Sequence, residues 1–282
     1  MRKHLHKHVL PAIVALVAPL ASGVAQSTVQ PPPTDTASAA LFNGRDLIRA
    51  VGFTGLTIAM FPIDRSIARR LTNERSKANK FLNNASKGVE VIADPGSIVI
   101  GTGLYVIGRV SHHPGLADLG WHGTESVLLG SSITWLVKGL AGRARPFATG
   151  DTTARDFKFG GGFGNADRQS FPSGHTTAAF AAAAAVTSEA ERGWPGHFWL
   201  VAPAMFGGAS LVGVSRMYHD KHWASDVVLG AAVGTFSGLK VVRYAHAHPR
   251  NFLDRAILRV QAVPAPDGSG PALAVVVPLQ IR

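Results

Sequence analysis

The sequence contains no cysteine, which excludes disulfides as well as thiolate nucleophiles and thiolate metal ligands. Acidic residues are also scarce, because 17 Asp and Glu stand against 28 Lys and Arg and give a formal net charge of +11. This excess of positive charge indicates partners that carry phosphate groups, or a membrane lipid surface with anionic head groups. We expect no nucleic acid among the partners, since the basic residues are dispersed and form no patch with aromatic side chains.

Long hydrophobic runs are nearly missing as well. A membrane-spanning helix needs about 20 mostly apolar residues, and only His197–Ser215 is clearly long enough. Charged residues such as Asp226 and Lys240 bracket the other apolar stretches. Short helices rich in glycine and alanine favour a packed soluble bundle. The alternative is a membrane-embedded protein, with which 46% hydrophobic residues and a mean hydropathy of +0.16 are compatible.

The N-terminal 40 residues differ from the rest of the chain. Residues 1–25 combine a basic start, an apolar run over Val9–Ala21 and small residues up to Ala25, which predicts a cleaved signal peptide. Residues 26–40 are rich in Pro, Ser and Thr and predict a disordered linker. We therefore expect an exported, periplasmic protein, with a membrane-embedded protein whose site faces the periplasm as the alternative.

Residues 41–250 form the predicted catalytic domain, an all-α bundle. Its apolar segments predict helices over Leu41–Ile63, Gly96–Val110, Trp121–Leu140, Phe198–Val214 and Ala224–Val242, together with an alanine-rich helix that starts near residue 173. Residues 251–282 form a β-rich tail, in which Ile257–Val263 and Ala272–Ile281 predict the two strands of a hairpin.

A short motif, Ser170-Phe-Pro-Ser-Gly-His-Thr176, precedes the alanine-rich helix. The first backbone N–H groups of a helix lack intrahelical partners, and together with the helix dipole they favour an anion. Gly174 has no Cβ to obstruct a phosphate, and His175 would lie beside the anion, able to move a proton. On its own, the motif is more typical of an ordinary capped helix with a surface histidine.

An upstream segment strengthens the interpretation as an anion site. Lys138 and Arg145 are seven residues apart, which predicts two cations on one face of a helix that Pro146 ends. The glycine-rich run Phe159–Gly164 follows, but it lacks the preceding strand and the Gly-Lys-Ser/Thr ending of a nucleotide-binding loop. We interpret this run as a mobile lid or a substrate-facing loop, with a plain connector as the alternative.

A downstream segment supplies a third cation and an imidazole with a carboxylate. Arg216 follows a serine, and His222 and Asp226 come six and ten residues after Arg216. One helical turn separates residues four apart, so the carboxylate of Asp226 is expected to hold the imidazole of His222 in one tautomer.

In this order the three motifs, K-x6-RP, PSGH and SR-x5-H-x3-D, resemble the type 2 phosphatidic acid phosphatase (PAP2) superfamily. That superfamily includes bacterial class A acid phosphatases, membrane lipid phosphatases and vanadium haloperoxidases. The resemblance covers about residues 125–239 and fills every defining position: Lys138, Arg145, Pro146, Pro172, Ser173, Gly174, His175, Ser215, Arg216, His222 and Asp226. It implies a PAP2-like helical bundle that acts on phosphate esters.

The resemblance also implies a mechanism, hydrolysis of a phosphomonoester through a phosphohistidine without a metal or other cofactor. His222 would be the nucleophile, oriented by Asp226, and His175 would protonate the leaving oxygen and then activate water. The groups expected to bind the phosphoryl oxygens are Lys138, Arg145, Ser173, Gly174 and Arg216. Vanadate is then expected as an inhibitor.

Two other functions fit the same residues. A vanadium haloperoxidase would hold vanadate as a cofactor through His222, and a non-catalytic module would bind a phosphate or a lipid head group. The sequence does not identify the ester that serves as substrate or the oligomeric state. Groups that select the substrate are expected in the glycine-rich run and in the polar segment Asp64–Lys87, whose simplest interpretation is a solvated helix face.

Overall fold

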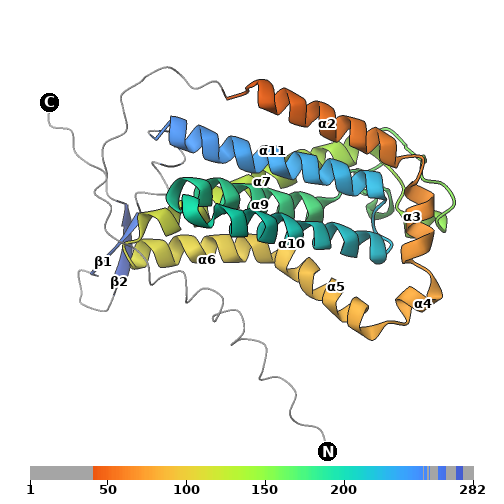
Figure 1. The fold of residues 1–282 in the computed structure, drawn as a ribbon, viewed down its shortest axis with the longest axis horizontal. Helices are drawn as coiled ribbons and strands as arrows, with labels where there is room; N and C mark the ends of the chain where they lie inside the picture. Colours follow the sequence, from red (N-terminus) through yellow and green to blue (C-terminus); the bar gives the residue numbers. More distant parts are fainter. Residues whose placement is uncertain (1–40, 250, 253, 255–259, 265–270, 276–282) are drawn as a thin grey trace, which may run out of the picture. The chain divides into compact units, whose positions relative to one another are not determined.

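The computed structural model describes residues 41–249, 251, 252, 254, 260–264 and 271–275. These residues form a bundle of α-helices, as predicted, and Figure 1 shows the long helices running side by side. The helices of four or more residues are α2 (Gly44–Met60), α3 (Asp64–Leu71), α4 (Glu74–Lys77), α5 (Lys80–Ala93), α6 (Gly96–Val110), α7 (Pro114–Ala141), α8 (Pro146–Thr149), α9 (Gly174–Gly193), α10 (Phe198–Tyr218) and α11 (Ala224–Ala247). The predicted signal peptide, residues 1–25, and the linker, residues 26–40, lie outside the described residues.

Helix α9 contacts α7, α10 and α11, and its closest neighbour is α11. The face of α11 toward α9 carries glycines at every fourth position, Gly230, Gly234 and Gly238. A Cβ on Gly230 would lie 2.6 Å from the carbonyl oxygen of Ser173, and one on Gly234 would lie 2.3 Å from that of Thr177. The two backbones are therefore in contact, and this contact fixes the N-terminus of α9 against α11.

Helices α6 and α7 approach each other in the same way. A Cβ on Gly108 would lie 2.3 Å from the amide nitrogen of Ala117, and one on Gly120 would lie 2.5 Å from the carbonyl oxygen of Gly101. Contacts between small residues are the usual way in which membrane helices associate, because lipid provides no hydrophobic force between them. The glycine and alanine content that favoured a soluble bundle is therefore equally suited to a membrane.

Among the described residues, two helical segments are long and apolar enough to cross a membrane, Pro195–Tyr218 and Ala224–Ala247. The number rises to as many as four if the bent pairs α2 with α3 and α5 with α6 each form one span. The sequence predicts only the first segment, because Asp226 and Lys240 count as polar ends of the second one. In the structure Asp226 is fully buried and the ammonium of Lys240 pairs with the carboxylate of Asp46.

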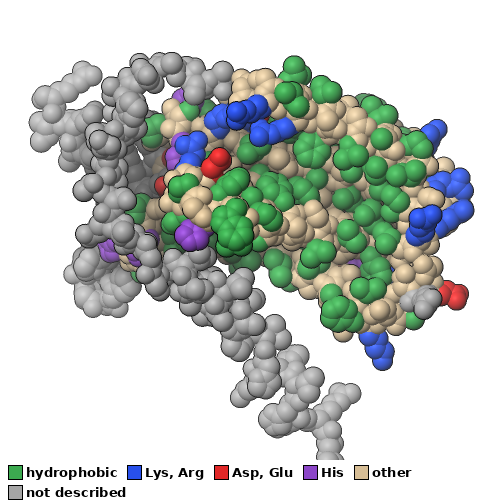
Figure 2. All heavy atoms as spheres, viewed as in Figure 1, with side chains coloured by type: hydrophobic (Ala, Val, Ile, Leu, Met, Phe, Trp, Pro, Cys, Tyr) green, Lys and Arg blue, Asp and Glu red, His purple; other side chains and the backbone are tan. Residues whose placement is uncertain are grey.

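Large apolar side chains cover the outside of the bundle. Figure 2 shows them across the middle of one face, with Lys and Arg side chains gathered toward its two ends. Exposed examples come from several helices and include Ile48 of α2, Val99 of α6, Trp135 of α7, Trp199 and Leu211 of α10. A broad apolar surface between two polar ends matches the thickness profile of a bilayer.

The C-terminal part contains two short strands, β1 (Val260–Pro264) and β2 (Pro271–Val275). They pair antiparallel, with Val260 opposite Val275. The predicted strands Ile257–Val263 and Ala272–Ile281 overlap them but extend into residues outside the described part of the chain, as do residues 265–270 between the strands.

Candidate active site

Lys138 and Arg145, the two cations of the K-x6-RP motif, are not arranged as predicted. Helix α7 ends at Ala141, and Gly142 follows in the left-handed conformation with φ of 54°. Arg145 is extended, so the prediction that Lys138 and Arg145 share one face of a continuous helix is wrong. The two cations nevertheless lie close together. The pKa of Lys138 is lowered to about 8, mainly by burial and then by the charge of Arg145.

The glycine-rich run is bound to the end of α7. The amides of Gly160 and Gly162 donate to the carbonyl oxygens of Leu140 and Gly139, at 2.8 and 3.2 Å. A Cβ on Gly162 would lie 2.0 Å from the carbonyl oxygen of Lys138, so only glycine permits this contact. The run therefore satisfies the last carbonyls of α7 and holds the turn that carries Lys138. These bonds identify it as a packed connector, in place of the mobile lid that we expected.

The PSGH motif forms the N-terminus of α9. Ser173 is the N-cap residue, but its amide donates to the carbonyl oxygen of Asp226 at 3.0 Å and its Oγ accepts from Thr176 at 2.8 Å. The amide of Ser173 is thus already occupied, contrary to the expectation that it is free for an anion. Helix α9 begins at Gly174, where a Cβ would lie 3.6 Å from the Nζ of Lys138. The start of α9 therefore faces the ammonium group of Lys138.

His222 lies in the loop before α11, and only 2% of its surface is exposed. Its Nδ1 lies 2.7 Å from the carbonyl oxygen of Ser170 and 3.6 Å from Oδ2 of Asp226. Because a carbonyl oxygen can only accept, Nδ1 carries the hydrogen and the lone pair of the neutral ring is on Nε2. Burial lowers the pKa of His222 to about 3, and the charges of Lys138 and Arg145 act in the same direction, whereas Asp226 opposes the shift. The imidazole is therefore neutral at neutral pH.

Asp226 organises the region behind His222. Its Oδ2 accepts from the Oγ of Ser170 at 2.5 Å and from the amide of Trp223 at 2.7 Å, and its Oδ1 accepts from Arg143 at 2.5 Å. Asp226 thus contacts the same serine whose carbonyl oxygen fixes the tautomer of His222. The predicted orienting role of Asp226 would act largely through Ser170, since the imidazole donates to that serine.

Arg143 is fully buried and joins three parts of the chain. Its guanidinium donates to Asp226, to Asp64 at the start of α3 at 2.7 Å, and to the carbonyl oxygen of Ala154 at 2.9 Å. The rings of four aromatic residues surround its Cζ at 4.8 to 5.8 Å: Phe61, Phe157, Phe171 and Trp223. Sequence reasoning missed this residue, although Arg143 lies within the first motif. Its partner Asp64 is 79 residues away, a separation that no local spacing indicates.

Arg216 and His175 form the other side of the site. A guanidinium nitrogen of Arg216 donates to the Oε2 of Glu90 in α5 at 2.6 Å, and the Nδ1 of His175 lies 3.7 Å from the carboxylate of Asp94. Burial and the nearby charge of Arg216 lower the pKa of His175 to about 4. Glu90 and Asp94 are contacts that the sequence motifs do not include.

Two buried donors in this region have no partner among the described residues, the Nε–H groups of Arg145 and Arg216. Buried donors are nearly always hydrogen-bonded, and an unmatched pair of guanidinium donors indicates a place for an anion. The positive charges of Lys138, Arg145 and Arg216 each lower the pKa of a neighbouring group in the site, so the three cations lie near one another. The arrangement can bind a tetrahedral anion beside a neutral histidine.

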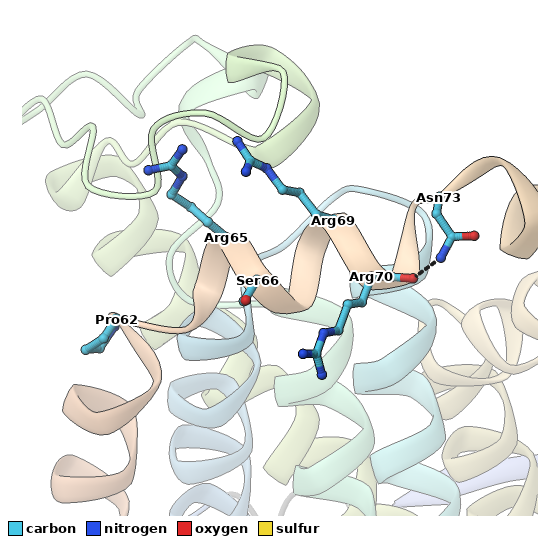
Figure 3. Close-up of a pocket in the computed structure, with 6 residues that line it drawn as sticks. All are labelled: Pro62, Arg65, Ser66, Arg69, Arg70 and Asn73. Carbon is cyan, nitrogen blue, oxygen red and sulfur yellow. Dashed lines mark hydrogen bonds between the residues drawn. The ribbon is translucent and has the colours of Figure 1, made fainter.

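A basic hollow of about 550 Å³ lies on α3, at the same end of the bundle. Asp64, the first residue of α3, accepts from the amide of Ser225 beside Asp226, which places the helix next to the site. Figure 3 shows Arg65 and Arg69 pointing to the same side of α3, while Arg70 points to the other side. None of these three arginines pairs with a carboxylate in the described part of the chain.

Comparison with known proteins gives one family. Residues 120–250 match the family model of the PAP2 superfamily. The lipid A 1-phosphatase of Porphyromonas gingivalis is 45% identical over 69 residues, which cover 24% of this chain and 15% of that protein. The match therefore spans only a small part of the curated relative's length.

Two solved structures are similar in fold. A transmembrane PAP2 type phosphatidylglycerolphosphate phosphatase from Bacillus subtilis has a TM-score of 0.49 and 18% identity, covering 73% of this chain and 98% of its own. LpxE from Aquifex aeolicus has a TM-score of 0.47 and 20% identity, covering 64% of this chain and 96% of its own. The family match rests on the sequence, and it contains every predicted site residue from Lys138 to Asp226. Residues 120–250 of this chain thus belong to the PAP2 superfamily.

Proposed function

We propose that this protein is a membrane-embedded phosphatase that hydrolyses a lipid phosphomonoester through a phosphohistidine on His222. The observation that carries the proposal is the neutral, buried imidazole of His222 beside the unpartnered guanidinium donors of Arg145 and Arg216. Only a neutral imidazole has a lone pair for attack on phosphorus, and a phosphate anion can accept from both donors.

In the first step the Nε2 of His222 attacks phosphorus, and the bond from phosphorus to the ester oxygen breaks. The leaving oxygen takes a proton from His175. That proton is acquired when the substrate binds. Burial and the charge of Arg216 keep the pKa of free His175 near 4, and the negative phosphate group counters the charge of Arg216. The products of this step are the free alcohol and a phosphohistidine.

In the second step His175, now neutral, takes a proton from water as the water oxygen attacks phosphorus. The bond between phosphorus and Nε2 breaks, inorganic phosphate leaves and His222 returns to its neutral form. Throughout both steps Nδ1 of His222 stays hydrogen-bonded to the carbonyl oxygen of Ser170, which keeps the ring oriented.

The charge of the transferring phosphoryl group is stabilised by fixed cations. Lys138, Arg145 and Arg216, together with the free amide at Gly174, contact its oxygens in our proposal. Glu90 holds the guanidinium of Arg216 through one nitrogen and leaves its Nε–H for the substrate. We expect this chemistry to need no cofactor, and we expect vanadate to inhibit by imitating the five-coordinate phosphorus.

A lipid substrate is supported by where the site lies. The candidate spans α10 and α11 end and begin at Tyr218 and Ala224, on either side of His222, which places the nucleophile at a helix end near the membrane surface. The arginines of α3 lie at the same end, where they would attract the anionic head group of the lipid. We propose that this end faces the periplasm.

The test is phosphate release by the protein purified in detergent. Short-chain phosphatidate and para-nitrophenyl phosphate would be compared with and without vanadate, for the wild type, His222→Ala and the control His197→Ala, which changes an exposed histidine. We expect vanadate-sensitive release from the lipid that only His222→Ala abolishes. Near-normal turnover by His222→Ala would exclude the covalent mechanism, and vanadate-dependent halide oxidation without phosphate release would favour a haloperoxidase.

A further inference from the structure

A second group of ionisable side chains lies at the far end of the bundle. The Oε1 of Glu189 lies 2.6 Å from Nδ1 of His122 and 3.0 Å from Nε2 of His246. His122 comes from the first turns of α7, Glu189 from the last turns of α9 and His246 from the last turn of α11. One ligand atom from each of the three residues lies within 4.8 Å of the others.

This group is separate from the phosphate site. His122 precedes Lys138 by 16 residues on α7, and Glu189 follows His175 by 14 residues on α9. At 1.5 Å per residue these separations correspond to about 24 Å and 21 Å. In a membrane-embedded bundle the two sites would therefore lie near opposite faces of the bilayer, so the second group takes no part in phosphoryl transfer.

The hydrogen bonds within the group leave one atom unsatisfied. His122 is only 3% exposed, and its Nε2 is buried without a hydrogen-bond partner among the described residues. The nearest carboxylate oxygen is Oδ2 of Asp254, at 3.7 Å. Asp254 itself is held by Trp121 at 3.2 Å and by Asn251 at 2.6 Å. A buried imidazole nitrogen directed at a fixed carboxylate needs an explanation.

We propose that His122, Glu189 and His246 bind a divalent transition-metal ion, with Zn²⁺ as the best-suited ion. Two imidazoles and one carboxylate form a common ligand set for zinc, and a chain without cysteine has no thiolate ligands to offer. The fourth position is open to water.

Metal binding would also resolve the unsatisfied nitrogen. With the ion on Nδ1 of His122, the ring hydrogen moves to Nε2, where it is directed at Asp254. A ligating imidazole that donates its other N–H to a carboxylate is the usual arrangement around protein metals. Asp118 and Glu125 are also near enough to interact electrostatically with His122, so carboxylates outnumber the imidazoles here and favour a cation.

The geometry needs only a small adjustment. Ligand atoms about 2.0 to 2.1 Å from a tetrahedral zinc are about 3.3 Å from each other. The present separations of 2.6 and 3.0 Å are those of hydrogen bonds, so the Glu189 oxygen would move away from the two imidazole nitrogens by about 0.7 and about 0.3 Å to admit the ion. Because the ligands come from α7, α9 and α11, the ion would fasten the far ends of the three helices that carry the phosphate site.

The test measures zinc content and thermal stability of the full chain, purified in detergent through a tag without histidine. The protein is stripped with a chelator and dialysed against Zn²⁺. The variant Glu189→Gln keeps the shape of the side chain but weakens a ligand, and its matched control is Glu191→Gln, an exposed glutamate two residues later on α9. We expect one tightly bound zinc and a zinc-dependent rise in Tm for the wild type and for Glu191→Gln, and neither for Glu189→Gln.

A second variant separates this site from other histidines. The double change His112→Ala and His113→Ala removes an adjacent exposed pair, and we expect it to leave zinc binding unchanged. Loss of the bound zinc in the double variant, equal binding by Glu189→Gln, or no stoichiometric zinc in the wild type would each overturn the proposal. Addition of Co²⁺ provides a check that does not depend on folding differences, since tetrahedral coordination gives a visible absorption band that Glu189→Gln should lack.

Discussion

Replacement of Arg143 by methionine removes the cation that joins Asp64 and Asp226 while it keeps a long apolar side chain. All three side chains have 0% exposure, so the two carboxylates would be left buried without their counter-ion. Loss of one partner of a buried ion pair costs about 3 to 5 kcal/mol. In a protein of this size about 1 kcal/mol lowers Tm by about 2 to 4 °C, so we expect Arg143→Met to lower Tm by about 6 to 20 °C.

The matched control is Arg168→Met. Arg168 pairs with Asp156 through two hydrogen bonds of 2.9 Å, but the two side chains are 23% and 35% exposed, and such a pair is worth about 0 to 1 kcal/mol. The assay is thermal unfolding in detergent followed by intrinsic fluorescence. A second change, Asp64→Asn, should recover part of the loss in the Arg143→Met protein. Equal Tm shifts for the two arginine variants would refute the reasoning that burial makes the Arg143 network dominant.

Four further predictions concern the phosphate site. His175→Ala should form phosphohistidine more slowly from an alkyl ester than the wild type does, and should lose less activity toward an ester with a good leaving group. Rapid-quench kinetics would measure both rates, and an equal loss for the two esters would contradict the role of His175 as an acid. Sulfate does not titrate near neutral pH, and we expect it to bind more tightly as pH falls. A bound anion raises the pKa of His175 from about 4, so protons are taken up on binding. Titration calorimetry should show that His175→Asn has lost this pH dependence. Affinity should fall further above about pH 8, where Lys138 loses its charge, and Lys138→Arg should move this fall upward. Glu90→Gln should weaken sulfate binding about 10-fold or more by releasing Arg216, whereas Glu74→Gln, on the exposed helix α4, should have no effect.

The sequence alone was sufficient to predict the helices whose bounds depend on neighbouring residues in the chain. The alanine-rich helix starts at the PSGH motif, and the helix over Gly96–Val110 has the predicted bounds, because apolar periodicity and glycine or proline at the ends determine both. The motifs also placed His175, His222 and the three cations of the site. Which of these side chains touches substrate, and in which role, stays a prediction.

Features that depend on distant contacts could not be predicted. The left-handed Gly142 ends α7 before Arg145, although the alanine and arginine that follow it would allow a helix to continue. The contact between His222 and the carbonyl oxygen of Ser170 spans 52 residues, so spacing alone pointed to Asp226. The apolar length of α11 was underestimated for the same reason, since a buried ion pair hides the charge of Lys240 from the outside of its helix.

Asp64 and Glu90 lie outside the region that matches the family model, residues 120–250, yet they bind Arg143 and Arg216 within it. A fragment limited to that region would contain all the motifs but would lack Asp64, one of the two carboxylates that pair with Arg143, and Glu90, the anchor of Arg216. A fragment that keeps both contacts therefore begins no later than α3. During synthesis from the N-terminus, Asp64 and Glu90 are therefore made before Arg143 and Arg216, the arginines that they bind.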